Sequence, residues 1–296
     1  MTDATAPGAW PVILFTVAVA LGVLRLMAQP WWVARRRQRQ SALAFPAAWR
    51  RILRRRVPLV ASLPTHLQLR LKRHIQVFIA EKPFIGCQGQ AITDEVRVTI
   101  AAQACLLLLG HERPDFFPRL KEILVYPGAF VVDREQAVGS GDGGGGGGGG
   151  SGGGGAGLNV VREQRQALSG ESWSQGRVVL SWADALTGAA DPHDARNVVV
   201  HEFAHQIDQD GGSANGHPWR ATPHLRRRWQ HVMNAAFERL QHTPSNVIDA
   251  YAATDLAEFF AVVSEVFFER PAELAAEAPE VYAEFSALYG LDPRQW

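Results

Sequence analysis

The sequence predicts a predominantly helical α+β domain with a small sheet, preceded by one transmembrane helix. An uncharged apolar stretch lies near the N-terminus, helical periodicity extends along much of the remaining chain, and two short runs are rich in β-branched residues. The 296 residues, of which 47% are hydrophobic and 20% charged, can bury a substantial core. This composition excludes collagen-like and wholly disordered chains.

The apolar stretch is interpreted as a membrane anchor formed by residues 1–34. No charged residue occurs from Ala4 to Leu24, and a helix extended to Met27 can cross about 30 Å of hydrocarbon. Tryptophans and arginines follow the stretch, whereas a cleaved signal peptide carries its positive charge in front. We therefore expect a single pass through the cytoplasmic membrane, with the chain from residue 35 onward in the cytoplasm. The alternative is a buried core helix over residues 10–27.

Positive charge is concentrated in the first part of the chain. Residues 1–80 contain 13 Lys and Arg residues against the single acid Asp3, although the whole chain has a net charge of +1. The arginine cluster between Arg50 and Arg56 is compatible with nucleic-acid binding, but no nucleic-acid motif accompanies it. Attraction to anionic lipid near the anchor is the simpler explanation, so no direct nucleic-acid binding is predicted.

The remaining chain is predicted to be one domain, residues 35–296. Residues 139–157 contain 15 of the 28 glycines and are expected to form a disordered insertion, because they offer few side chains to bury. Short predicted strands lie on both sides of the insertion, so it decorates the domain without dividing it. The expected elements before and after it are helices over His66–Ala80 and Arg97–Leu109 and strands over Glu122–Tyr126 and Gly176–Trp182.

A His-Glu-x-x-His motif begins at His201, and it indicates zinc chemistry. On a helix, His201 and His205 lie one turn apart on the same face, so both imidazoles can reach one Zn²⁺. Glu202 can then contact a water molecule on the metal as a general base. The motif predicts a zinc metallopeptidase.

Catalytic zinc normally takes a third protein ligand, which the motif does not contain. The metzincin continuation would need Gly at 208 and His at 211, whereas the sequence has Asp208 and Gly211. A carboxylate on a later element is therefore expected.

Two glutamates on a predicted amphipathic helix over Thr254–Glu269 are candidates for this ligand. Glu258 and Glu265 lie seven residues apart and share a face. Asp255 and Glu258 also have the spacing of a capping box, which would turn Glu258 back onto the start of the helix. Glu265 can equally be a charge that faces solvent, so spacing alone leaves both candidates open.

These residues resemble the Mlc titration factor A family of zinc metallopeptidases, which is related to the catalytic domain of anthrax lethal factor. The resemblance covers roughly residues 45–296. It is carried by His201-Glu-Phe-Ala-His-Gln-Ile-Asp, Asp249-Ala-Tyr-Ala-Ala-Thr-Asp-Leu-Ala-Glu-Phe-Phe-Ala-Val-Val-Ser-Glu265, Trp49-Arg-Arg-Ile-Leu, Phe84-Ile-Gly-Cys, Thr93-Asp-Glu-Val-Arg-Val-Thr-Ile-Ala-Ala-Gln-Ala-Cys105, Ile123-Leu-Val-Tyr-Pro127 and Gly170-Glu-Ser-Trp173.

The resemblance implies a zincin-like fold with a site of the glutamate-zincin type. Glu258 would be the third zinc ligand, and Tyr251 would face the active site, where its hydroxyl can donate a hydrogen bond to the developing oxyanion. The alternative for Tyr251 is simple packing at the helix entrance. The implied activity is aminopeptidase-like cleavage of a peptide or protein substrate. The alternative function is regulatory, in which the protein sequesters a transcriptional repressor and peptidase activity is secondary.

The chain departs from the family pattern in its polyglycine insertion and its predicted anchor. Lethal factor also has a carboxylate four residues after its ligand Glu, where this chain has Val262. Support for the imidazole of His201 must therefore come from another group. Asp208 and Asp249 are the candidates.

Overall fold

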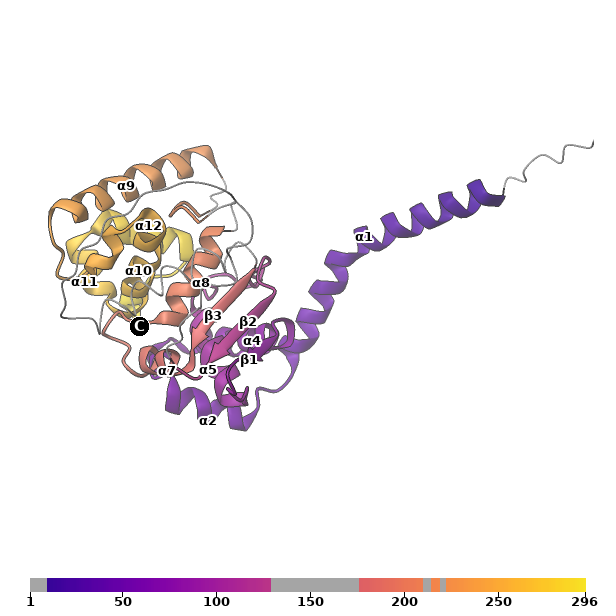
Figure 1. Cartoon of the computed structure of the whole chain (residues 1–296), viewed down its shortest axis with the longest axis horizontal. Helices are drawn as coiled ribbons and strands as arrows, with labels where there is room; N and C mark the ends of the chain where they lie inside the picture. Colours follow the sequence, from indigo (N-terminus) through magenta and orange to yellow (C-terminus); the bar gives the residue numbers. More distant parts are fainter. Residues whose placement is uncertain (1–9, 129–175, 210–213, 219–221) are drawn as a thin grey trace, which may run out of the picture. The chain divides into compact units, whose positions relative to one another are not determined.

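The computed structural model describes residues 10–128, 176–209, 214–218 and 222–296. It divides into two compact units, Met1–Ala44 and Phe45–Trp296, which are described separately (Figure 1). The predicted glycine-rich insertion, residues 139–157, lies outside the described residues.

The first unit consists of one long helix, α1 (Trp10–Ala42). Its segment Ile13–Ala42 has a mean hydropathy of 1.8 in its most apolar window, so this helix is long and apolar enough to span a membrane. Apolar side chains such as Leu14, Phe15 and Met27 are exposed, whereas a core helix would bury them. The helix continues past residue 34, where the predicted anchor ends, through the following arginines to Ala42.

The second unit is mostly helical and contains one small parallel sheet. Its strands are ordered β1-β2-β3, and Ile123 on β2 pairs with Val178 on β3. The sheet side chains Ile123, Val125, Val178 and Leu180 are fully buried. The strands are β1 (Phe84–Gly86), β2 (Glu122–Tyr126) and β3 (Arg177–Ser181).

The two helices expected before the insertion, His66–Ala80 and Arg97–Leu109, agree within three residues with α4 and α5. Thr93 begins the second expected helix, because its side chain accepts a hydrogen bond from the Val96 amide, and this helix packs against α4 and α2. The bounds are α2 (Ala47–Arg56), α3 (Leu59–Ser62), α4 (Thr65–Glu81) and α5 (Asp94–Leu106).

The remaining helices form the second half of the unit, with α8 between the sheet and the C-terminal helices (Figure 1). Helix α10 packs against α8, α9 and α11, and aromatic rings surround it: Trp229 and Phe285 each contact Phe260. The bounds are α7 (Trp182–Ala190), α8 (Val198–Asp208), α9 (Pro223–His242), η3 (Ala250–Ala253), α10 (Leu256–Glu269), α11 (Pro271–Glu277), α12 (Pro279–Tyr289) and η4 (Pro293–Gln295).

Candidate metal centre

Helix α8 presents the two histidines of the motif on one face. Asn197 begins the helix, because its side-chain oxygen accepts a hydrogen bond of 3.0 Å from the amide of Val200. Phe203 and its apolar neighbours bury the opposite face in the core. The rings of His201 and His205 consequently lie side by side, with centroids 4.9 Å apart.

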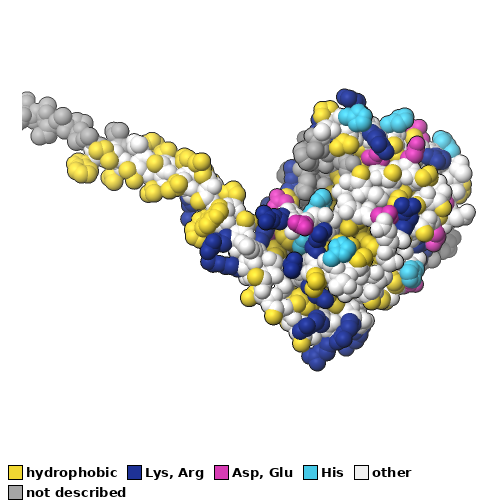
Figure 2. Space-filling view, turned by 180° about the vertical axis from the view of Figure 1, so that it is seen from behind, with side chains coloured by type: hydrophobic (Ala, Val, Ile, Leu, Met, Phe, Trp, Pro, Cys, Tyr) yellow, Lys and Arg dark blue, Asp and Glu magenta, His cyan; other side chains and the backbone are white. Residues whose placement is uncertain are grey.

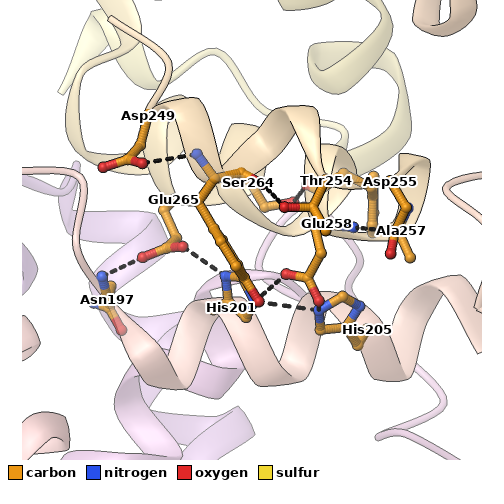
Figure 3. Close-up of polar contacts among 12 residues, drawn as sticks. Asn197, His201, His205, Asp249, Thr254, Asp255, Ala257, Glu258, Ser264 and Glu265 are labelled. Carbon is orange, nitrogen blue, oxygen red and sulfur yellow. Dashed lines mark hydrogen bonds and ion pairs between the residues drawn. The ribbon is translucent and has the colours of Figure 1, made fainter. Parts of the chain in front are cut away.

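Helix α10 brings the carboxylate of Glu258 to these histidines. Asp255 caps the helix, accepting hydrogen bonds of 2.8 Å from the Ala257 amide and 2.9 Å from the Glu258 amide. The Glu258 side chain is buried and contacts both imidazoles, so the capping-box alternative for its carboxylate is wrong (Figure 3).

The donor atoms of His201, His205 and Glu258 converge on one small volume. The two Nε2 atoms are 3.2 Å apart, and the Glu258 oxygens lie 3.1 Å from Nε2 of His201 and 3.8 Å from Nε2 of His205. One donor atom from each residue lies within 4.8 Å of the other two. Two imidazole nitrogens and a carboxylate satisfy the ligand preference of a divalent transition metal, so the group can hold a metal ion.

Glu265 supports His201 from the side opposite Glu258. Its Oε1 lies 2.7 Å from Nδ1 of His201, and its other oxygen accepts a hydrogen bond from the Asn197 backbone amide (Figure 3). This contact favours the tautomer with the proton on Nδ1 and leaves the lone pair of Nε2 for a metal. Glu265 is buried, so its interpretation as a solvent-facing charge is wrong.

Asp208 and Asp249, the candidates for supporting His201, have other roles. Oδ2 of Asp208 accepts hydrogen bonds from the amides of Asn215 and Gly216, at 2.6 and 2.7 Å. Asp249 accepts a hydrogen bond from the Tyr251 amide and begins η3. Both carboxylates therefore organise backbone around the centre, and the prediction that one of them supports His201 is wrong.

A second buried carboxylate extends the network behind Glu265. Oε1 of Glu269, one turn further along α10, accepts a hydrogen bond of 2.9 Å from the Asn197 side-chain amide. Burial, together with the charge of Glu265, raises the pKa of Glu269 to about 8, despite the hydrogen bond from Asn197. Asn197 thus contacts both carboxylates and also caps α8. Sequence reasoning missed this role.

The histidines and Glu258 have coupled ionisation. Burial favours neutral Glu258, but hydrogen bonds to the histidines outweigh it and lower the pKa of Glu258. Burial likewise opposes the charged imidazole of His201, yet its contacts with Glu258 and Glu265 raise the pKa of His201 well above its ordinary value. Burial lowers the pKa of His205 to about 4. The centre thus favours one positive charge between its donor atoms, which either a proton or a metal ion supplies.

The two expected catalytic side chains also lie at this centre. The ring of Tyr251, on η3, has its centroid 6.2 Å from that of His201. Burial, followed by the charge of Glu258 and a hydrogen bond to it, raises the pKa of the Tyr251 hydroxyl. The charge of Glu202 contributes to the same shift, and Glu202 itself is buried on α8. All five predicted site residues therefore lie together.

Comparison with known proteins agrees with the motifs over most of the chain. The family model described as glucose-regulated metallo-peptidase M90 matches residues 31–144 and 155–290. An uncharacterized protein of Synechocystis sp. is 35% identical over 284 residues, which cover 94% of this chain and 96% of that protein.

Relatives named Mlc titration factor A show similar identity. The protein from Cronobacter sakazakii is 35% identical over 275 residues, covering 89% of this chain and 91% of its own. The protein from Klebsiella pneumoniae is 36% identical over 250 residues, covering 81% and 84%. The chain belongs to the glucose-regulated metallo-peptidase M90 family.

Proposed function

We propose that the protein is a zinc-dependent peptidase of the glutamate-zincin type, in which His201, His205 and Glu258 hold the metal. The convergence of two imidazole Nε2 atoms and one carboxylate, with Glu265 on the far nitrogen of His201, carries this proposal. Two nitrogens and one oxygen form the three-ligand set of catalytic zinc sites, which keep a fourth position for water or substrate. The M90 family match supports a metallopeptidase.

Zinc bound there would supply a Lewis acid that acidifies water and polarises the peptide carbonyl. Glu202 is the general base, which accepts a proton from the attacking water and returns it to the leaving amine. Tyr251 donates its hydroxyl hydrogen bond to the carbonyl oxygen as negative charge develops. Its raised pKa keeps the hydroxyl protonated, and able to donate, at neutral pH.

The substrate is a peptide or protein, and the cleavage is aminopeptidase-like. Helix α1 anchors the chain in the cytoplasmic membrane, with the peptidase unit in the cytoplasm. The length and hydropathy of α1 and the arginines that follow its apolar part support this placement.

A second candidate function rests on the name of the relatives, Mlc titration factor A. It describes those proteins as factors that titrate Mlc. This chain would then bind a transcriptional repressor, and peptide hydrolysis would be secondary.

Metal analysis of the purified full-length protein, combined with a peptide-library cleavage profile, tests the peptidase proposal. We expect about one zinc ion per chain and hydrolysis that chelation abolishes. Glu202→Gln should keep the metal and lose hydrolysis, because Glu202 acts on water and is not among the ligands. Undiminished hydrolysis by this variant would exclude the mechanism. If Glu202→Gln still relieves repression in cells as fully as the wild type does, the regulatory function is favoured.

A further inference from the structure

A basic pocket lies in the Phe45–Trp296 unit, formed by α2, α3 and α4. Its volume is about 690 Å³. Arg50, Arg51, Arg54 and Lys72 supply its cationic lining. Its apolar lining includes Leu53, Val57, Pro58, Val60 and Ala61.

The helical spacing of α2 explains the two kinds of lining. Arg50, Arg51 and Arg54 fall on one side of the helix, since residues three and four apart are neighbours on a helix surface. Leu53 and Val57 are buried beside them. Figure 2 shows Lys and Arg side chains gathered at the lower end of the globular unit, the end at which α2 is drawn in Figure 1.

The arginines of this helix differ in whether a carboxylate neutralises them. Arg55 and Arg56 both contact Glu95 at 2.5 Å. Among the described residues, no carboxylate forms an ion pair with Arg50, Arg51 or Arg54, and these three side chains are exposed. No carboxylate in the described ranges forms an ion pair with Lys72 either, although its side chain is half-buried. Four cations thus line the pocket without a counter-charge from the part of the chain that the structure describes.

We propose that this pocket binds the phosphate-bearing headgroup of an anionic phospholipid, with the glycerol and upper acyl carbons against its apolar lining. Guanidinium groups match phosphate oxygens in geometry and charge. A free phosphate needs only the cations, whereas an amphiphile uses both linings. In the sequence, only residues 43–46 separate α1, the helix that contains the proposed membrane-spanning segment, from α2, which supplies three of the cations.

This inference rests on the proposed membrane attachment, but it can be tested separately. The full-length chain in mild detergent is titrated with dihexanoyl phosphatidylglycerol or dihexanoyl phosphatidylcholine, and bound lipid is counted by native mass spectrometry. We expect at least about tenfold tighter binding of the anionic lipid. The triple variant Arg50→Gln, Arg51→Gln, Arg54→Gln should lose most of this preference, because each cation near an anionic membrane surface contributes roughly fivefold.

A matched variant removes the same charge elsewhere. Arg113→Gln, Arg227→Gln, Arg239→Gln replaces three exposed arginines outside the pocket and should retain the preference. If the pocket triple variant does not fold, Lys72→Gln alone must weaken binding of the anionic lipid by about fivefold.

Several results would overturn the proposal. One is an unchanged lipid preference in the pocket variants. A second is competition by inorganic phosphate at concentrations equal to the lipid, which would identify a site for free phosphate. A third is tighter binding of a short single-stranded DNA that the triple variant loses, which would identify a nucleic-acid surface. Carbonate washing of membranes tests the anchor independently, because release of the chain refutes the anchor and leaves the comparison of lipids valid.

Discussion

Replacing Glu265 by Gln should weaken metal binding although Glu265 does not reach the metal group itself. Its two oxygens accept hydrogen bonds from different donors, Nδ1 of His201 at 2.7 Å and the backbone amide of Asn197. Glutamine offers only one acceptor oxygen, so its amide nitrogen must face one of these donors. One hydrogen bond to a charged acceptor, worth about 1.5–3 kcal/mol, is therefore lost.

The lost hydrogen bond should affect metal binding through the ring of His201. Without the carboxylate on Nδ1, the ring is less basic and less firmly oriented, and such changes cost roughly 10–100-fold in metal affinity. This range corresponds to about 1.4–2.7 kcal/mol. Competition with a chromophoric zinc chelator at neutral pH measures the dissociation constant directly.

Glu269→Gln is the matched control, because it makes the same change one turn further along α10. Glu269 contacts the Asn197 side chain, whereas it is Glu265 that contacts Nδ1 of His201, so zinc affinity should change by less than about threefold. Equal zinc affinity in the wild type and Glu265→Gln would refute the positioning role. Complete loss of zinc in Glu265→Gln, with retention in Glu258→Gln, would show that Glu265 is the ligand.

Three further changes have distinct expected results. Glu258→Gln removes the anionic donor, so zinc affinity should fall by orders of magnitude in the same chelator assay, and retention of zinc would contradict its assignment. Glu269→Gln should change the pH dependence of stability: the folded-state pKa of about 8 is raised above the ordinary 4.5, so this group's contribution is full below pH 4.5 and is lost as pH rises through 8. Between pH 4.5 and 8 the variant's free energy of unfolding should therefore rise relative to that of the wild type, by at most about 3 kcal/mol at pH 7. Denaturant unfolding at several pH values measures this difference, and a difference that does not change with pH would contradict the prediction. Gly216→Ala should destabilise the protein and weaken zinc binding, because a Cβ at this φ of +72° would lie 2.2 Å from the carbonyl oxygen of Leu256 at the start of α10. Gly89→Ala is the control, because Gly89 also has a positive φ, +81°, but an added Cβ there has open space around it and meets no clash. An equal loss of zinc affinity in the Gly216 and Gly89 variants would show that the clash with Leu256 is irrelevant.

Sequence patterns predicted the parts of the centre that local spacing determines. His201 and His205 share a face because any helix places residues four apart together, and the flanking apolar residues predict that helix. Spacing could not decide between Glu258 and Glu265, since both lie on one face of α10. They contact opposite nitrogens of His201, an arrangement that depends on how α8 and α10 pack against each other.

Glu265 is buried because of the position of α10 in the fold. The amphipathic pattern over Thr254–Glu269 is compatible with a solvent-facing charge at Glu265, but every residue from Glu258 to Glu269 is buried. Figure 1 shows the reason, because α10 lies among α8, α9, α11 and α12. The sequence does contain a signal, since Glu258, Glu265 and Glu269 are the only charged residues of this segment and Ser264 is its only other polar residue.

Acids on a fully buried helix must be paired or protonated, because an isolated buried charge is too costly. The three glutamates of α10 meet this requirement in different ways. Glu258 contacts both histidines, Glu265 contacts one histidine and a backbone amide, and Glu269 is held neutral by its raised pKa. Removing His201 and His205 should therefore remove the contacts that lower the pKa of Glu258 and keep it charged. The charge balance of α10 thus depends on the same imidazoles that the proposed chemistry requires.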